Sequence, residues 1–515
     1  MSLPVVLVIG AGPAGLTAAH ELAVAGRYRP IVLEAAPRVG GLAATVRHGG
    51  HRIDIGGHRF FTKSDRVLAW WLAMLPLERA ADASWMLSYQ GARRALTSDA
   101  DGPDPATTDE VMLVRRRKSR IYHRGQFFDY PLSLSPATVL KLGLARTAWV
   151  GASYLRAQLF PRRPEDTLEA FLVNRFGRAL YASFFRDYTE KVWGRSCRDI
   201  SAEWGRQRIK GLSIAKAIAT AVRKRLGRAG PVETSLIEHF LYPKLGPGQM
   251  WETCARAVTR LGGEVLTGAR VVGIAVERGA ARAVTVVRAD GTRQELAGDW
   301  VISTMPIRDL VESLDGVALS DDERGIARGL EYRDFLTVGL LVDRFGPGPG
   351  RLDDCWIYVQ EPGVRVGRIQ LFNNWSPWMV GDPARDWIGL EYFLDETDRM
   401  WAASDAELVA LATAELGTLG LVGAGTVRDA TVLRVRKAYP GYFGTYDRLG
   451  TLRDALDERV ANLVLVGRNG MHRYNNQDHS MLAAMTAVDQ IHAGRVDKRA
   501  IWAVNTDDTY HEERA

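Results

Sequence analysis

Glycines near the start of the chain have the spacing of a phosphate-binding turn. The apolar, β-branched run at residues 5–9 is followed by Gly10, Gly12, Pro13, Ala14 and Gly15. Gly10 permits a tight turn, Gly12 leaves room for a pyrophosphate against backbone N–H groups, and Gly15 lets strand and helix pack closely. Glu34 lies about 20 residues further on, after a second apolar run, where it can accept hydrogen bonds from a ribose diol. This pattern predicts a dinucleotide site.

The residues after Glu34 distinguish between two dinucleotides. A glycine pair closely follows Arg38, and a plain NAD-binding turn has no need for such a pair, so we expect FAD. The segment resembles the second FAD fingerprint of the glutathione-reductase-like flavoproteins, in particular their amine oxidase and desaturase branch. That resemblance implies FAD contacts for Ala35, Arg38, Gly40, Gly41 and Leu42.

A further glycine pair, Gly56 and Gly57, stands directly before His58. The pattern suits a loop that passes under an isoalloxazine ring, because Cβ atoms would clash there while the imidazole could hydrogen-bond the flavin. His58 could instead satisfy a backbone carbonyl. We predict cofactor contacts for all three residues and consider His58 a candidate catalytic residue.

The most distinctive string, residues 188–194, resembles the Tyr-Thr-Glu-Lys-Gln-Trp-Gly motif of UDP-galactopyranose mutases. In that family the aromatic residues help to form the uridine and sugar pocket. The resemblance therefore implies substrate contacts for Tyr188 and Trp193. The alternative is that both aromatic residues anchor a helix in the core.

Two arginines are candidates for binding a substrate diphosphate. Residues 204–209 resemble a mutase motif whose arginine, here Arg208, contacts the diphosphate. Residues 330–333 resemble a stretch that offers a second arginine, here Arg333, next to Tyr332. Two guanidinium groups on one diphosphate would form charge-assisted, bidentate pairs. A surface position for Arg333 is the alternative.

The last block, residues 467–480, resembles a mutase string at the flavin-ring end. It implies pocket roles for Arg468, Tyr474 and Asn476, although one residue rather than three separates the Tyr from the Asn. Residues 439–442 resemble mutase and protoporphyrinogen oxidase segments more loosely, which implies substrate contacts for Tyr439 and Tyr442. The implied flavin contacts are Gly467, Arg468, Gln477, Asp478, His479 and Ser480, the last four capping a helix at 481–491 whose N–H groups face the flavin C2 carbonyl.

The elements that must position these residues are spread along the chain. A strand, turn and strand at 262–274 resemble the part of these flavoproteins that clamps the adenine, which implies a contact for Val272. Apolar runs at 299–306 and 462–468 read as two further buried strands. We predict an α/β protein whose FAD-binding Rossmann domain, of the glutathione-reductase-like type, is discontinuous over residues 1–80, 240–310 and 450–500.

The intervening parts predict two inserted domains and a tail. Helical periodicity at 136–158, 167–176, 179–189 and 214–228 predicts a mainly helical cap over 81–239. Alternating runs predict a mixed-sheet substrate domain over 311–449, and 501–515 is a C-terminal tail. The helix at 139–160 could lie on a membrane, but we favour an apolar stripe that faces the core.

Composition narrows the partners. The 515 residues carry 67 Lys and Arg against 60 Asp and Glu, and no basic block extends beyond residues 115–118, so we expect no nucleic acid. Only 3 cysteines occur, far apart, which favours a reducing compartment and no metal site. No run of 18 apolar residues suggests a membrane span. We expect a cytoplasmic protein and leave its oligomeric state open.

Three classes of function follow. The whole chain resembles the superfamily of amine oxidases, protoporphyrinogen oxidases and UDP-galactopyranose mutases, with motifs nearest the mutases. We favour a mutase-like enzyme that acts on a sugar nucleotide through N5 of reduced flavin, with NAD(P)H as a candidate reductant. The alternative is an oxidoreductase that takes a hydride from a small or apolar substrate. A flavin-binding scaffold without catalysis is the third class.

Overall fold

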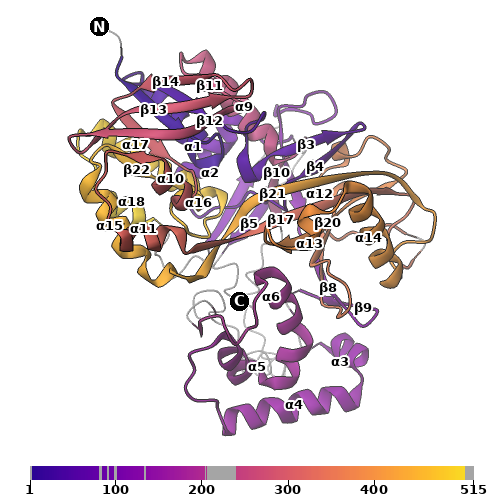
Figure 1. Ribbon diagram of the computed structural model, residues 1–515. Coiled ribbons are helices and arrows are strands. Elements are labelled where there is room, and N and C mark those ends of the chain that lie inside the picture. The colour runs from indigo at the N-terminus through magenta and orange to yellow at the C-terminus, as the bar shows by residue number, and fades with distance from the viewer. Residues whose placement is uncertain are drawn as a thin grey trace.

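A five-stranded parallel sheet carries the N-terminal turn (Figure 1). The computed structural model describes residues 3–79, 84–89, 92–97, 101–130, 132, 135–202, 205, 239–348 and 350–504. The order in the sheet is β11 (Glu264–Leu266), β2 (Arg29–Leu33), β1 (Val5–Ile9), β15 (Trp300–Ser303) and β22 (Leu463–Leu465). Strands from the start, middle and end of the chain therefore lie side by side in one mixed α/β fold.

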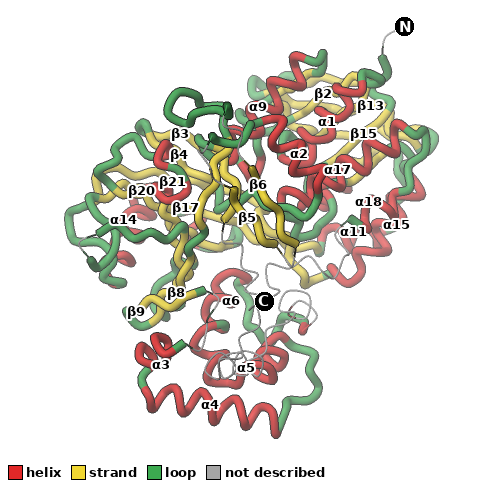
Figure 2. The backbone as a smooth tube through the Cα atoms, turned by 180° about the vertical axis from the view of Figure 1, so that it is seen from behind, coloured by secondary structure: helices red, strands yellow, loops and turns green. Residues whose placement is uncertain are grey.

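The parallel sheet is covered on both faces, which explains why its strands are apolar throughout. One face packs against helices that lie together in Figure 2, namely α1 (Pro13–Ala25), α2 (Asp65–Met74), α9 (Pro247–Arg260) and α17 (Gln477–His492). The other face packs against a four-stranded sheet of β14 (Arg293–Ala297), β13 (Ala280–Arg288), β12 (Ala269–Glu277) and β16 (Leu314–Asp315). Val284 and Val286 of β13 share a buried core with Val301 of β15.

A seven-stranded mixed sheet forms the second part of the molecule. Its order is β21 (Val427–Gly444), β17 (Leu330–Val342), β20 (Asp386–Leu394), β19 (Arg368–Leu371), β18 (Trp356–Val359), β8 (Ser119–His123) and β9 (Gln126–Asp129). Only the β18–β8 pair is parallel. α14 (Asp405–Thr418) packs on β17 and β21.

Smaller elements connect these layers. The two-stranded pairs are β3 (Thr45–His48) with β4 (His51–Asp54), β5 (Ser84–Tyr89) with β6 (Ala92–Thr97), and β7 (Met112–Arg116) with β10 (His239–Pro243). The remaining helices are α10 (Ile307–Ser313), α11 (Asp321–Arg328), α12 (Phe372–Trp375), α13 (Arg399–Ala402), α15 (Leu449–Arg459), α16 (Gly467–Gly470) and α18 (Lys498–Ala503).

The described part of residues 81–239 is less helical than the sequence predicts. Five strands, β5 to β9, occupy the first part of this range. Two of them pair with distant strands, β7 with β10 and β8 with β18. These strands were not predicted because their formation depends on partners far away in the sequence, which local periodicity does not reveal. The cap is formed by α3 (Pro136–Leu142), α4 (Leu144–Leu159), α5 (Leu168–Phe184) and α6 (Arg186–Trp193). The predicted helix at 214–228 lies outside the described residues.

The apolar stripe at 139–160 does not face the core, contrary to our expectation. Val150 and Ala157 are buried on the side of α4 that packs on α5. Six large apolar side chains on α3, on α4 and at its C-cap are exposed, since α5 covers only one narrow strip of α4. Those exposed side chains are Leu140, Leu144, Trp149, Leu155, Leu159 and Phe160.

Candidate functional site

The turn between β1 and α1 is closed by backbone hydrogen bonds. Gly10, at φ +99°, donates its N–H to the last carbonyl of β2 at 2.8 Å. A Cβ atom on Gly15 would lie 1.9 Å from Gly10 O, so only glycine permits this close packing. Glu34 accepts the N–H of Ala11 at 2.7 Å, which holds its carboxylate beside the turn.

Two glycine loops approach each other in front of α1. Gly40 donates its N–H to Ala11 O at 2.8 Å, and a Cβ atom on Gly41 would lie 3.1 Å from the Cα of Gly12. α1 begins at Pro13, and its N-cap glycine offers no side chain to the first N–H groups. A helix N-terminus between walls of glycine fits the charge and the size of a pyrophosphate.

Three other segments border these loops. A Cβ atom on Gly467, at φ +82°, would lie 3.0 Å from the Cβ of Ala14, so the start of α16 closes on α1. The N–H of Ala269, the first residue of β12, donates to the carbonyl of Glu34 at 2.7 Å. Val272 is 36% exposed on the same strand, at a register shift. The other predicted residues here, Ala35 and Arg38, are exposed.

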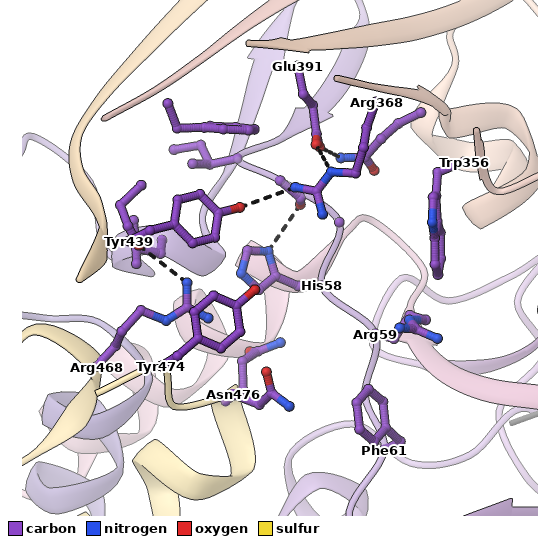
Figure 3. A pocket seen from close by; sticks show the side chains of 18 of the residues that line it. His58, Arg59, Phe61, Trp356, Arg368, Glu391, Tyr439, Arg468, Tyr474 and Asn476 are labelled. Atoms are coloured by element: carbon purple, nitrogen blue, oxygen red, sulfur yellow. Dashed lines mark hydrogen bonds and ion pairs between the residues drawn. The ribbon is translucent and has the colours of Figure 1, made fainter. Parts of the chain in front are cut away.

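A polar cavity opens where these loops meet the seven-stranded sheet (Figure 3). Its wall combines three sources: the loops after α1, the strands β18 to β21, and the turn between α16 and α17. Its lining residues include Leu42, Gly56, Gly57, His58, Arg59, Phe61, Trp356, Tyr358, Arg368, Gln370, Glu391, Tyr439, Arg468, Tyr474, Asn476, Gln477 and Asp478. The structure thus brings together most of the residues that the motifs at 56–58 and 467–480 predict.

Arg368 projects into this cavity from β19. It forms an ion pair with Glu391 on the neighbouring strand, and its Nη2 donates to the hydroxyl of Tyr439 at 3.1 Å. Gln370 also donates to Glu391, whose side chain is fully buried. The carboxylate is therefore neutralised within the wall, and Arg368 is held in one orientation.

Arg468 lies across the cavity on α16. Its guanidinium donates to two backbone carbonyls, Asn475 O at 3.0 Å and Ala438 O at 3.4 Å. The guanidinium carbon lies 4.6 Å from the ring centre of Tyr474, and that ring stacks on Tyr439 at 5.7 Å. No carboxylate of the described residues forms an ion pair with Arg468. Its positive charge is therefore available to a ligand.

His58 is neutral in the folded protein. Burial, reinforced by nearby Arg468, lowers the pKa of His58 to about 3. Its Nδ1 lies 3.0 Å from Gly56 O and must donate to it, because a carbonyl only accepts. Nε2 then carries a lone pair. His58 thus satisfies a backbone carbonyl and also lines the cavity as a hydrogen-bond acceptor.

The N-terminus of α17 closes the cavity with buried polar residues. Gln477 accepts the indole N–H of Trp251 at 3.1 Å, and the N–H of Asn476 donates to Nδ1 of His479 at 3.3 Å. Burial raises the pKa of Asp478 to about 7 and lowers the pKa of His479 to about 3. Ser480 is buried in the same turn. Near neutral pH, His479 is therefore neutral and a substantial fraction of Asp478 is protonated.

The aromatic residues of the 188–194 string lie behind the cavity wall. Tyr188 is half-buried with its ring edge-on to Tyr358, which lines the cavity, at 5.3 Å. Trp193 is buried in the cap core, 6.5 Å from the ring of Tyr442. Between them, Lys191 donates to three backbone carbonyls and so attaches α6 to the seven-stranded sheet. The string positions the cap and leaves Tyr188 beside Tyr358, close enough to Arg368 for the two groups to interact electrostatically.

Arg333 does not face the cavity. Its guanidinium donates to Asp395 at 3.0 Å and to the carbonyls of Phe393 at 2.9 Å and Val192 at 3.2 Å. These partners use its donors to join β17 to β20 and to the end of α6. Tyr332 packs its ring on His472 at 4.7 Å. The predicted diphosphate contact of Arg333 therefore lacks support, and Arg208 lies outside the described residues.

Some lining residues have no motif in the sequence. Arg59, Trp356, Arg368 and Glu391 come from four separate segments that meet only in the fold. Arg59 lies over the ring of Trp356 at 4.4 Å. One sequence signal could have revealed Arg368 as a site residue. It alternates with Gln370 within a short apolar strand, and a polar or charged group on a buried strand needs a partner or a ligand. Tyr442, a pocket residue in our sequence prediction, holds the turn before α17. Its hydroxyl accepts the N–H of Tyr474 at 2.7 Å.

Comparison with known proteins defines the class of the chain. A family model described as flavin containing amine oxidoreductase matches residues 13–473. Polyamine oxidase 1 of Oryza sativa subsp. japonica is 49% identical over 55 residues, and this match covers 10% of the chain and 11% of that relative. The chain belongs to the flavin-containing amine oxidoreductases and is an FAD-dependent enzyme.

Solved structures show the same fold at low identity. Reduced UDP-galactopyranose mutase superposes with a TM-score of 0.77 at 20% identity, covering 99% of this chain and 100% of that chain. A protein assigned as protoporphyrinogen oxidase from Exiguobacterium sp. 255-15 has a TM-score of 0.66 at 17% identity, covering 96% and 100%. Putrescine oxidase follows at 0.56 and 16%, covering 96% and 99%. In the described ranges, no helix has the length and apolar character needed to cross a bilayer.

Proposed function

We propose that the cavity binds a sugar nucleotide next to the flavin, in an enzyme of mutase-like chemistry. The observation that carries this proposal is Arg468, a cation at the cavity wall that backbone carbonyls and tyrosine rings hold, with no ion-paired carboxylate among the described residues. A substrate phosphate would provide the missing counter-charge through charge-assisted hydrogen bonds.

The glycine loops support the placement of FAD. Its pyrophosphate would lie at the N-terminus of α1 between Gly12 and Gly41, and its ribose would lie near Glu34. The ring would lie by the Gly56 and Gly57 loop and the N-terminus of α17. Bound FAD supplies a ring that can accept a hydride when oxidised or act as a nucleophile through N5 when reduced.

The residues of this chain would bind and orient the substrate. Arg468 would take a phosphate oxygen, and the phenols of Tyr439 and Tyr474 would donate to phosphate or sugar oxygens. Arg368, fixed by Glu391, would keep Tyr439 in place and contribute its remaining donors. Such fixed donors stabilise the charge of a departing diphosphate at no cost of reorganisation.

The alternative is an oxidoreductase acting on a small or apolar substrate. Membership of the amine oxidoreductase family favours it, as does the aromatic side of the cavity, which includes Phe61, Phe335 and Trp356. A protonated amine, however, would meet the positive charge of Arg468 with little carboxylate charge to balance it, because Glu391 is already paired and burial raises the pKa of Asp478 to about 7. An uncharged or anionic reductant would suit this wall better than an amine.

Titration of FAD-loaded protein with UDP tests the proposal. UDP should change the flavin absorption spectrum, and Arg468→Met should weaken its binding by about 10- to 100-fold while FAD stays bound. Arg495→Met, an exposed arginine at the other end of α17, is the matched control and should bind UDP normally.

An activity screen separates the two functions. UDP- and dTDP-sugars should be converted only by prereduced enzyme, because N5 of the flavin is a nucleophile only in the reduced state. The mutase reaction involves no net oxidation, so the substrate itself would not reduce the flavin. Steady oxygen consumption with an amine or a porphyrinogen, and no response to UDP, would establish the oxidoreductase instead. Failure of every donor to reduce the flavin would favour the non-catalytic scaffold.

A further inference from the structure

The exposed apolar side chains of this protein are concentrated on the cap. Of the eleven large apolar residues that are exposed in the described ranges, six lie between residues 140 and 160. Their exposed fractions are 80% for Leu140, 78% for Leu144, 58% for Trp149, 62% for Leu155, 73% for Leu159 and 76% for Phe160. A soluble monomer seldom presents such a cluster unless it contacts something.

Four of these side chains lie on α4, with Leu140 on α3 and Phe160 at the C-cap of α4. Leu144, Leu155 and Leu159 recur at helical spacing on the side opposite to Val150 and Ala157, which are buried. On the buried side the packing is tight, since a Cβ atom on Gly177 of α5 would lie 2.7 Å from the backbone of α4. The orientation of α4 is therefore set by α5, and its apolar face points outward.

Positive charge accompanies the apolar face. Residues 136–164 contain one lysine, four arginines and no acidic residue. Arg156 lies on the exposed side of α4, and Arg163 is exposed in the turn that follows it. Apolar side chains flanked by Lys and Arg match the boundary between the acyl chains and the head groups of an anionic bilayer.

The position of α4 at the edge of the molecule allows it to contact a flat surface such as a membrane. Figures 1 and 2 both show α3 and α4 at one extremity of the molecule, with α9 and the four-stranded sheet that contains β13 at the opposite end. With 16 residues, α4 is about 24 Å long. It cannot cross a bilayer with Arg146 and Arg156 along its length, but it can lie in the plane of one.

We propose that α3 and α4 dock the cap onto the surface of an anionic lipid bilayer. Leu144, Leu155 and Leu159 would enter the acyl boundary, while Arg156 and Arg163 would contact lipid phosphates. This inference is independent of the substrate proposed above, because none of these residues lines the cavity.

Flotation of the full-length, FAD-loaded protein with lipid vesicles tests the proposal. The protein should bind vesicles of phosphatidylcholine with phosphatidylglycerol more tightly than vesicles of phosphatidylcholine alone. The double variant Leu155→Gln, Leu159→Gln should weaken binding by about tenfold or more. Arg156→Gln with Arg163→Gln should remove the preference for anionic lipid. Leu261→Gln, an exposed leucine after α9, is the matched control and should bind as the wild type does.

A labelled variant reports the depth of α4 directly. All three native cysteines are buried, so Leu155→Cys introduces a single exposed thiol for an environment-sensitive fluorophore. Anionic vesicles should shift its emission to the blue, and a probe at Leu261→Cys should not respond. Wild-type protein that stays off anionic vesicles overturns the proposal. So does a dimer that the Leu155→Gln, Leu159→Gln variant dissociates, since the face would then be an interface between two copies.

Discussion

At the scale of single residues, burial decides which side chains around the cavity carry charge. His58 and His479 are kept neutral because desolvation disfavours their imidazolium forms. The carboxylate of Glu391 is matched by Arg368 inside the wall. Among the described residues no carboxylate pairs with Arg468, and Arg59 adds another guanidinium to the wall. A cavity of neutral acceptors, phenols and guanidinium groups suits an anionic, hydroxyl-rich ligand.

The neutral state of His58 predicts how stability depends on pH. Because its pKa is about 3 in the folded state and about 6.5 in the unfolded state, only the unfolded chain gains this proton as the pH falls from 7 to 5. The wild type should therefore lose about 2 kcal/mol more of its free energy of unfolding than His58→Gln does over that range. Urea unfolding with excess FAD at both pH values measures the difference. Equal losses would show that His58 is protonated in the folded protein.

At the scale of elements, the turn from β1 to α1 separates two roles of glycine. Gly15 is required by the fold, since a Cβ atom there would lie 1.9 Å from Gly10 O. Gly12 has ordinary space around it, because its nearest neighbour to such an atom, the Cα of Gly41, lies 3.8 Å away. Packing therefore does not require a glycine at this position, and we propose that its lack of a side chain serves a ligand.

A pair of alanine substitutions distinguishes these roles. Gly12→Ala should leave the melting temperature of the FAD-free protein within about 1 °C and weaken FAD binding by at least tenfold, because the methyl group fills the place of a phosphate. Gly15→Ala should destabilise the FAD-free protein itself, by about 2 kcal/mol or more. Calorimetry and FAD titration measure both. If Gly12→Ala binds FAD normally, the pyrophosphate does not lie in this turn.

The elements also show where periodicity is informative. The strands at 5–9, 300–303 and 463–465 were predictable because burial on both faces demands apolar runs. The segment 139–160 was predictable as helical, but it forms two helices that meet at Gly143, and the direction of its apolar face was not predictable. An amphipathic pattern defines an apolar face without saying whether protein or lipid covers that face.

At the scale of the whole molecule, FAD should hold distant parts of the chain together. The loops that fit it come from residues 10–15, 40–41 and 467, and they are packed against one another through glycines. Removal of FAD should therefore lower the stability by about 4 kcal/mol relative to protein with FAD at 1,000 times its Kd. The melting temperature should rise with added FAD and with no other dinucleotide. A melting temperature independent of FAD would contradict this placement of the cofactor.

The dinucleotide turn, the second glycine pair and the block at 467–480 were recognisable in the sequence, because each is a local pattern whose spacing follows from backbone geometry. The motifs marked both Arg468 and Arg333, and the fold was needed to show that Arg468 lines the cavity whereas Asp395 and two carbonyls engage three donors of Arg333. The fold also brings Arg368, which no motif marks, into the cavity wall. It likewise sets the outward direction of α4 through its contact with α5. Charge pairing and solvent exposure depend on neighbours in space, and sequence motifs do not specify those neighbours.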